Sequence, residues 1–587
     1  MIPARVALFA FAVFIATAPL VLSEFQVTLL NYIGLAAMIA LGLVLLTGIA
    51  GVMSFGQQVF AGLAAYATAV LTTKYAASPW LALVVGLAIV GAVSLFLGAI
   101  TLRLSGHYLP ISTIAWGIAI YFLFGNMELL GRYTGLPGLP PISLAGAKLD
   151  TGPKIYYLIW AIALALLVAA SNLLDSRSGR AIRALRFRGV MAESFGVDTL
   201  RLKTVVFLYA ALFAGVSGWL YAHFLRFVSP GAFNVNAGIE YLFMAVVGGA
   251  GYVWGAVIGA SILTVLKEWL KDVLPTSFGA SGNYEIVVFG VLMLLLLQRA
   301  STGLAPVLAR WTIAPRRRAI APQSEPLPRR RLPQAGEPLL EVQGATKHFG
   351  GLVVVRDLSF EMRSGEILGL IGPNGAGKST MFNLITGVLP ADGGRISFQR
   401  ARIDGLRPPE VARRGIARTF QHVNLVGAMS VLENVAIGAH LRGRHGTLRA
   451  MLRAERAEEG RLLAEAARQI ERVGLKAHAN DAAGSLPLGT QRLVELARAL
   501  SADPTLLLLD EPAAGLRYAE KQALAALLRR LRDEGTSILL VEHDMDFVMG
   551  LVDRLVVMDF GEKLAEGLPA EIQADPAVLE AYLGGVE

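Results

Sequence analysis

The chain of 587 residues contains no cysteine. This absence excludes disulfides, thiol nucleophiles and cysteine metal sites, and it leaves the cellular compartment open. Charge is scarce in one half: residues 1–300 hold 27 charged side chains, whereas residues 301–587 hold 70. The first half is therefore too apolar for a soluble domain, and the second half has an ordinary soluble composition. A single soluble enzyme, a disordered chain and a fibrous chain are excluded.

Apolar runs fill the first half of the chain. Most of them approach the ~20 residues that a helix needs to cross a bilayer, so they predict an all-α polytopic membrane domain. The runs cover residues 6–22, 27–54, 58–73, 79–102, 108–130, 155–174, 204–225, 239–266 and 284–298. Arg5 before the first run is typical of a signal peptide, but a second run follows within a few residues. We therefore expect the first run to stay in the protein.

Positive charge predicts the orientation of these runs. Residues 177–203 form the densest basic loop, and basic loops stay in the cytoplasm. Six runs precede this loop, so the N-terminus is expected in the cytoplasm, and three runs separate the loop from the soluble half. Three full crossings would place the soluble half on the side opposite to the basic loop, although both are expected in the cytoplasm. The run at 239–266 contains Gly248, Gly249 and Gly251, which permit a broken helix. We expect about eight spans plus one re-entrant or twice-crossing element.

A segment rich in proline and arginine separates the two halves. Residues 301–338 contain seven prolines and seven arginines, and proline keeps such a segment extended. A solvated tether is the favoured interpretation, and binding to anionic lipid heads is the alternative. The basic excess lies in the membrane-like half, so no nucleic acid is expected as a partner. The predicted domains are a membrane domain at 1–300, this linker at 301–338 and a soluble domain at 339–587.

The soluble half contains a phosphate-binding loop. The apolar residues 366–371 predict a buried strand, and an apolar helical pattern follows the loop. Between them lies the sequence Gly372, Pro373, Asn374, Gly375, Ala376, Gly377, Lys378, Ser379 and Thr380. Glycines let backbone N–H groups surround phosphates at the start of a helix. Lys378 is expected to neutralise the β- and γ-phosphates of ATP, and Ser379 to ligate Mg²⁺.

Acidic residues end a second buried strand. Four leucines precede Asp510 and Glu511. Asp510 is expected to hold Mg²⁺, and Glu511 to polarise the attacking water. A third strand, at 537–541, leads to His543, which is expected to contact the γ-phosphate. The predicted chemistry is ATP hydrolysis by an α/β phosphate-loop fold.

This ordered set of motifs resembles the nucleotide-binding domain of ATP-binding-cassette (ABC) transporters. The resemblance implies that Gln421 belongs to a glutamine loop that touches Mg²⁺ and the membrane domain, and that Phe349 stacks on adenine. The family signature appears in altered form at Leu486–Thr490, with Pro487 where a serine is usual and with Gly489 retained to contact the nucleotide across a dimer. The departures put the contribution of this signature to hydrolysis in question.

The permease-like half resembles the permeases of branched-chain amino acid importers. The resemblance is carried by the segments 54–66, 134–139, 178–186, 192–196 and 239–249. The segment around Glu193 is similar to the coupling motif whose short helix docks on the ATPase near the glutamine loop. The segments 349–352 and 581–584 resemble the ATPase subunit of the same importer. The chain is therefore identified as a fused permease and ATPase.

The resemblance implies ATP-driven import by alternating access across a bacterial inner membrane, with the ATPase domain in the cytoplasm. Branched-chain amino acids are the expected solutes, and urea or short amides are the alternative. Expected partners are membrane lipid, an extracytoplasmic solute-binding protein, and a second permease and second ATPase; a homodimer also satisfies the last requirement. An exporter half-transporter and a membrane-anchored regulatory ATPase are the rival classes. The polar Glu240 within an apolar run favours a transport pathway.

Overall fold

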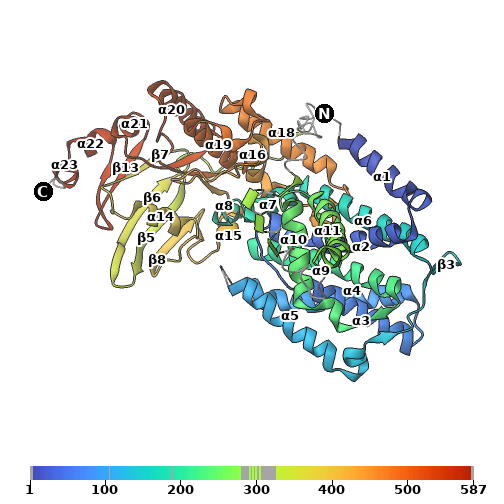
Figure 1. Ribbon diagram of the computed structural model, residues 1–587. Coiled ribbons are helices and arrows are strands. Elements are labelled where there is room, and N and C mark those ends of the chain that lie inside the picture. Colours follow the sequence, from blue (N-terminus) through green and yellow to red (C-terminus); the bar gives the residue numbers. More distant parts are fainter. Residues whose placement is uncertain are drawn as a thin grey trace. The chain divides into compact units, whose positions relative to one another are not determined.

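The computed structural model describes residues 4–104, 106, 108–186, 189–278, 290–291, 294–295, 298–299, 303–305 and 325–583. The chain divides into two compact units (Figure 1). Unit 1 comprises Met1–Asp175, Leu200–Arg316 and Ala450–Arg453, and unit 2 comprises Ser176–Thr199, Arg317–Arg449 and Ala454–Glu587. The predicted domain borders at 300 and 338 stay predictions.

Unit 1 is built of apolar helices. Its helices are α1 (Ala4–Val21), α2 (Glu24–Leu43), α3 (Gln57–Lys74), α4 (Pro79–Thr101), α5 (Tyr108–Asn126), α6 (Gly152–Leu174), α9 (Thr199–Leu225), α10 (Val235–Gly249) and α11 (Gly255–Phe278), with the π-helical segment η1 (Val44–Ile49). The short elements between them are η2 (Glu128–Leu130), η3 (Arg132–Thr134), β1 (Leu136–Pro137), β2 (Ile142–Leu144), β3 (Ala147–Leu149), β4 (Phe227–Val228) and η4 (Pro230–Phe233). Polar side chains set several helix starts: Ser23, Ser78 and Asn234 each accept a hydrogen bond from a backbone N–H of the following turn.

Five helices in the described part of the chain are long and apolar enough to cross a membrane. They are Glu24–Ile49, α4, α5, α6 and α9, and Phe9–Val21 and α10 are shorter apolar helices. The predicted number of about eight spans is therefore not confirmed and stays a prediction. Most of the last apolar run, at 284–298, lies outside the described residues.

The run at 239–266 is broken, as its glycines predict. Helix α10 ends at Gly249 and α11 begins at Gly255, so the run forms two helices joined by a short turn. Glycines let the two helices touch by backbone: a Cβ on Gly259 would lie 1.8 Å from the carbonyl oxygen of Met244. A Cβ on Gly248 would likewise lie 1.8 Å from the carbonyl oxygen of Gly255. Small residues of this kind drive close helix packing where lipid removes the hydrophobic driving force.

Unit 2 contains two β-sheets. The six-stranded sheet has the order β10-β11-β12-β7-β13-β14, in which β14 alone is antiparallel to its neighbour. The strands are β7 (Ile367–Ile371), β10 (Ile416–Arg418), β11 (Leu506–Asp510), β12 (Ser537–Val541), β13 (Arg554–Asp559) and β14 (Glu562–Gly567). A second, antiparallel sheet has the order β6-β5-β8-β9, from β5 (Pro338–Phe349), β6 (Leu352–Arg363), β8 (Gly393–Phe398) and β9 (Ala401–Arg402).

Continuous burial explains the central strands. Every residue of β7, β11 and β12 is buried, as expected for parallel strands covered on both faces. The helices between residues 325 and 583 are α14 (Lys378–Ile385), α15 (Pro408–Arg414), α16 (Val431–Gly438), α17 (Thr447–Met451), α18 (Arg456–Arg472), α19 (Leu488–Ser501), α20 (Tyr518–Asp533), α21 (Met545–Met549), α22 (Pro569–Ala574) and α23 (Pro576–Leu583). Single turns are η5 (Ala439–Arg442), η6 (Lys476–His478) and η7 (Ala483–Ser485). The strand ends at one edge of this sheet position the candidate site.

The described end of the linker, residues 325–338, is mostly exposed but contacts the rest of unit 2, and the tether interpretation stays a prediction. Leu327 is buried against Ala439 and Leu462. The backbone N–H of Arg330 donates to Asp503, and Arg442 donates to the carbonyl oxygen of Pro328 at 3.0 Å. Arg330 also donates from its guanidinium to the carbonyl oxygen of Arg413 at 3.1 Å, so one apolar side chain and three hydrogen bonds attach residues 327–330 to the rest of unit 2.

The glycine contact between α10 and α11 generates a first prediction. Gly259→Ala places a methyl group against the carbonyl oxygen of Met244, so the two helices must separate. We expect a lower midpoint of thermal unfolding for the purified membrane complex, equivalent to about 1–3 kcal/mol. Gly251→Ala is the matched control, because no heavy atom of the described residues lies within 4 Å of the added methyl group. Equal midpoints for the two variants would contradict the packing argument.

Candidate functional site

A cavity of about 280 Å³ lies at the carboxyl ends of β7, β11 and β12 in unit 2. The predicted residues that line it are Asn374, Gly375, Gly377, Lys378, Ser379, Thr380, Gln421, Glu511 and His543. Val354 and Val541 complete the lining. The structure thus gathers most of the predicted site around one space, although their separate roles remain predictions.

The phosphate loop connects β7 to α14. Gly377, with φ of +94°, is the residue before α14, and a Cβ there would lie 2.6 Å from the carbonyl oxygen of Val354. The ammonium of Lys378 donates to the carbonyl oxygens of Gly372 at 2.7 Å and Pro373 at 2.8 Å, which holds the loop closed around the side chain. Burial lowers the pKa of Lys378, and the nearby carboxylates Glu511 and Asp510 oppose that shift. Backbone N–H groups and a cation at a helix start form an anion site.

The predicted side chains of Gln421 and His543 both approach the carboxylate of Glu511. Gln421 donates from Nε2 to Oε1 of Glu511 at 2.9 Å, and Nε2 of His543 lies 3.2 Å from the same oxygen. Glu511 has φ of +49°, a conformation that non-glycine residues rarely adopt. Its backbone N–H donates to the carbonyl oxygen of Val541, so the neighbouring strand holds the strained residue in place. The carboxylate is positioned at the cavity wall, where a water molecule could be polarised.

Asp510 is suited to a cation. Its side chain is buried, and Oδ1 lacks a hydrogen-bond partner among the described residues. Burial raises the pKa of Asp510, while the nearby Arg418 guanidinium opposes the shift. A buried carboxylate oxygen without a partner fits a divalent cation, and Ser379 and Gln421 line the adjacent cavity. These three residues would hold Mg²⁺, which would supply charge neutralisation at the phosphates.

Other predicted nucleotide residues lie apart from this cavity. Three residues of the phosphate loop do not line the cavity: Gly372, Pro373 and Ala376. Phe349 and Gly489 are also not among the described lining residues. Phe349 is 47% exposed at the end of β5, so its ring is open to a stacking base. Helix α19 begins at Leu488, so Gly489 lies in its first turn. Pro487 is the N-cap residue of α19, and its side chain makes no hydrogen bond to the backbone of the first turn.

Two charged residues near the site were missed by sequence reasoning. Arg418 is buried and donates to the side chains of Asn383, in α14, and Thr386, which follows α14. Burial lowers the pKa of Arg418 to about 10. Glu542 accepts a hydrogen bond from the backbone N–H of Ala513 at 2.6 Å, which positions the loop after Glu511. Each is a charge at the end of an apolar strand, the same signal that identified Asp510.

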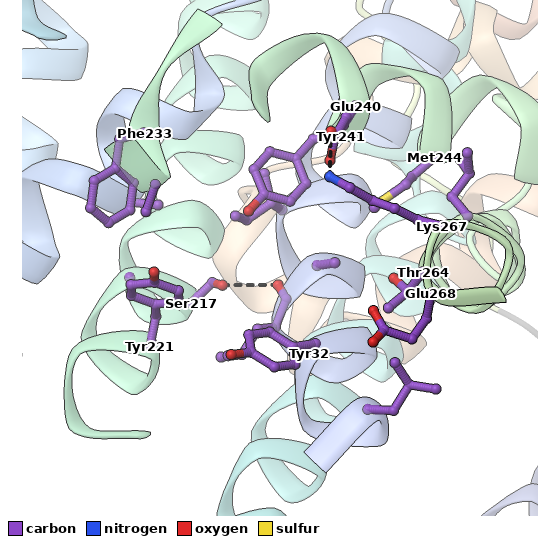
Figure 2. Close-up of a pocket in the computed structure, with 18 of the residues that line it drawn as sticks. Tyr32, Ser217, Tyr221, Phe233, Glu240, Tyr241, Met244, Thr264, Lys267 and Glu268 are labelled. Atoms are coloured by element: carbon purple, nitrogen blue, oxygen red, sulfur yellow. Dashed lines mark hydrogen bonds and ion pairs between the residues drawn. The ribbon is translucent and has the colours of Figure 1, made fainter. Parts of the chain in front are cut away.

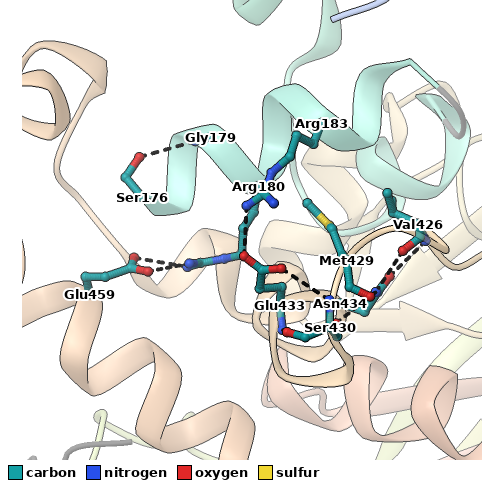
Figure 3. A network of polar contacts seen from close by, with 10 residues as sticks. All are labelled: Ser176, Gly179, Arg180, Arg183, Val426, Met429, Ser430, Glu433, Asn434 and Glu459. Carbon is teal, nitrogen blue, oxygen red and sulfur yellow. Dashed lines mark hydrogen bonds and ion pairs between the residues drawn. The ribbon is translucent and has the colours of Figure 1, made fainter. Parts of the chain in front are cut away.

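Residues Ser176–Thr199, here the coupling segment, pack on the ATPase within unit 2 (Figure 3). The segment contains α7 (Arg177–Leu185) and α8 (Gly189–Ser194). Arg180 is 1% exposed and forms a two-pronged ion pair with Glu459, with Nη2 at 3.1 Å from Oε2. Arg183 pairs with Glu433 at 3.0 Å. Glu193 instead accepts from Thr199 inside the segment, so arginines rather than Glu193 make these ionic contacts.

A chain of contacts leads from the coupling segment toward the glutamine loop. The ring of Phe195 is buried, and the Arg498 guanidinium carbon lies 5.0 Å from its centroid. Arg498 pairs with the buried Glu495 at 2.8 Å and donates to the carbonyl oxygen of Asn424 at the same distance. Glu495 accepts from the backbone N–H of Asn424. Asn424 follows Gln421 by three residues, so the chain ends beside the nucleotide cavity.

Family comparisons agree with this division of the chain. Residues 25–297 match the permease component of the branched-chain amino acid transport system, residues 355–514 match the ABC transporter family, and residues 562–587 match the branched-chain amino acid ATP-binding cassette transporter family.

Curated relatives cover the ATPase half. The LivG protein of Salmonella typhimurium, a high-affinity branched-chain amino acid transport ATP-binding protein, is 45% identical over 42% of this chain and 98% of its own length. The BraF protein of Pseudomonas aeruginosa, described in the same terms, is 41% identical over 42% of this chain and 98% of its own. A solved nucleotide-free ATP-binding cassette from an ABC transporter is 32% identical, covers 42% of this chain and 98% of that one, and has a TM-score of 0.38.

The chain belongs to the branched-chain amino acid family of ABC transporters. It joins the permease and ATP-binding parts of that family in one polypeptide, as the sequence predicts. Its second half is an ABC ATPase, which binds ATP and couples its hydrolysis to transport.

The geometry at Glu511 generates a second prediction for this ABC transporter. Glu511→Gln keeps the shape of the side chain but removes the charge that polarises water, so ATP turnover should fall by about 10²–10⁴-fold while ATP binding persists. Lys378→Ala should instead weaken ATP binding, because the phosphates lose their matched charge. Turnover and nucleotide binding are measured on the purified complex.

Glu562→Gln is the control for this pair of variants, since its exposed side chain lies in β14 away from the cavity lining. Normal turnover in Glu511→Gln would show that another group activates the water.

Proposed function

We propose that this chain imports branched-chain amino acids across a bacterial inner membrane by ATP-driven alternating access. The observation that carries the proposal is the fusion itself: a permease part of this family and an ATPase part 45% identical to LivG occupy one chain. The basic coupling segment, expected in the cytoplasm, clusters with the ATPase unit, which supports an ATPase domain on the same side.

Each site residue has a proposed role. The backbone of the loop 372–380 and Lys378 bind the phosphates of ATP, and Phe349 stacks on the adenine. Ser379, Gln421 and Asp510 hold Mg²⁺. Glu511 accepts a proton from the attacking water, and His543, whose Nε2 lies 3.2 Å from Oε1 of Glu511, contacts the γ-phosphate. Gly489 offers its backbone N–H to the ATP of a partner domain.

Transport requires that these events reach the permease. Closure of two ATPase domains on ATP moves α19, because its first turn carries Gly489. Helix α19 also carries Arg498, which contacts Phe195 of the coupling segment. The coupling segment therefore moves with the ATPase surface on which Arg180 and Arg183 are anchored, and it changes access to the permease.

The proposed assembly contains a second permease and a second ATPase. One chain supplies one phosphate loop and one signature, whereas each composite ATP site needs the signature of another domain. Pro487 has neither a hydroxyl nor an N–H to donate, which favours a different ATPase as partner over a homodimer. An extracytoplasmic binding protein is proposed to deliver the solute.

The experiment that tests this function is import by the native complex. The complex is purified from its own membrane through a tag on this chain and placed in proteoliposomes with the co-purified binding protein. We expect uptake of labelled leucine, isoleucine and valine that requires ATP and is lost in Glu511→Gln. Uptake of urea or acetamide without uptake of leucine would overturn the proposed solute class. ATP turnover without any uptake would favour a regulatory ATPase.

The buried ion pair of Arg180 and Glu459 generates a further prediction. Removing one partner of a buried pair leaves an uncompensated charge, which costs about 3–5 kcal/mol. Arg180→Met and Glu459→Leu should therefore each reduce transport-stimulated ATP turnover, while the double variant should recover much of it. Nucleotide binding is the control, because neither residue lines the ATP cavity. Additive losses in the double variant would show that the two side chains do not act as a pair.

A further inference from the structure

A cavity of about 470 Å³ lies among α2, α9, α10 and α11 in unit 1 (Figure 2). This volume falls in the range of small-molecule sites. Tyr32 of α2 and Tyr221 of α9 line one side, and Glu240 of α10 and Lys267 of α11 line the other. The cavity is separate from the nucleotide site, and none of its residues has a role in ATP hydrolysis.

Four charged side chains line this cavity. The ammonium of Lys267 lies 2.7 Å from Oε1 of Glu240, and that of Lys271 lies 3.1 Å from Oε2 of Glu268. Among the described side chains of the lining, two carboxylates and two ammonium groups give a formal charge of zero. Charged groups within membrane helices are costly, and they mark pathways of polar solutes. Each of the four remains about one third to one half exposed, so each can still reach a ligand.

Apolar side chains form the rest of the wall. Leu35 and Ile39 of α2, Met244 of α10 and Leu263 of α11 also line the cavity, and all four are buried. Ser217 donates its hydroxyl to the carbonyl oxygen of Leu35 at 2.8 Å, which uses its hydrogen within the wall. The cavity therefore combines a neutral set of opposite charges with an aliphatic surface.

The predicted orientation places this cavity toward the outer side of the membrane. If the coupling segment is cytoplasmic, α9 runs outward and Tyr221 lies near its outer end. Tyr32 lies near the outer start of α2, and Glu240 near the outer start of α10. Helix α11 returns outward, which brings Lys267 to the same level. A solute delivered from outside would meet this cavity first.

We propose that this cavity binds the zwitterion of an aliphatic amino acid during transport. The α-carboxylate of the ligand pairs with Lys267, the α-ammonium pairs with Glu240, and the aliphatic side chain packs against Leu35, Ile39 and Met244. A zwitterion separates the Glu240–Lys267 pair yet leaves the charge of the cavity at zero. A cation or an anion would leave an unpaired charge. This inference rests on the proposed function and adds the site of the solute.

The test compares charge variants of the native complex in proteoliposomes, with the same binding protein throughout. Lys267→Met and Glu240→Gln should each raise KM for leucine by about tenfold, since one charge-assisted contact is lost. Basal ATP turnover should stay within about twofold. Lys154→Met and Glu128→Gln are matched controls at exposed ion pairs outside the cavity, and they should change neither quantity.

Competing analogues separate recognition from packing. Lys267→Met leaves a negative cavity, so leucinamide, a cation, should become a relatively better inhibitor of leucine uptake. Glu240→Gln leaves a positive cavity, so 4-methylpentanoate, an anion, should improve instead. Because the binding protein is the same throughout, a changed ratio of inhibition by leucinamide to inhibition by 4-methylpentanoate is caused by the substitution in this chain. Changes in the same direction for both variants, or an unchanged KM, would overturn the inference.

A second measurement needs no variant. Photo-leucine, a diazirine analogue of leucine, should label the wild-type complex on peptides from α2 or α10, and excess leucine should block the label. Labelling confined to other parts of the permease would overturn the site. If the wild-type complex imports no branched-chain amino acid, the proposed function fails and this inference with it. If wild type imports leucine but the tests above fail, only the cavity assignment falls.

Discussion

Parallel pairing of three buried strands is the constraint on which the ATPase unit depends. β12 lies between β11 and β7 in parallel register, so their carboxyl ends meet at one edge. Lys378, Glu511 and His543 follow these three strands and therefore converge on one cavity. The strain at Glu511 fits the same scheme, because its backbone N–H is held by Val541 at the end of β12. The sheet thus places the ammonium of Lys378, the carboxylate of Glu511 and the imidazole of His543 before any nucleotide enters.

Local sequence motifs predicted the phosphate loop and much of the nucleotide site. Contacts between residues far apart in the sequence could not be predicted. The phosphate loop and the break between α10 and α11 follow from glycines that few other residues could replace. The Arg180–Glu459 pair could not be predicted, because its partners are 279 residues apart and no motif in the sequence identifies Glu459 as the partner. The docking of Leu327 escaped notice for a similar reason: its proline-rich surroundings indicate an extended segment but not the surface that receives it. Sequence reasoning thus finds chemistry at strand ends more readily than it finds docking surfaces.

Burial of charge is what makes the coupling segment a specific fit rather than a loose one. Arg180 and Arg498 are both fully buried guanidinium groups, and each has a carboxylate partner. An unpaired charge in such a place is strongly destabilising, so the segment is held in the one position that satisfies Arg180. The permease cavity follows a different rule. Its pairs are partly exposed, so they can exchange partners with a ligand at lower cost.

Helix α19 connects the signature residue Gly489 with the coupling segment. Its first turn carries Gly489, which would face a partner's nucleotide, and Arg498 lies nine residues later against Phe195. A helix rises ~1.5 Å per residue, so ~14 Å of continuous backbone separates the two ends. Because Arg498 is also bonded to Asn424 and Glu495, the helix cannot shift without moving the segment after Gln421. The nucleotide contacts proposed at Gly489 and Gln421 would therefore act on the same buried arginine and, through Phe195, on the coupling segment.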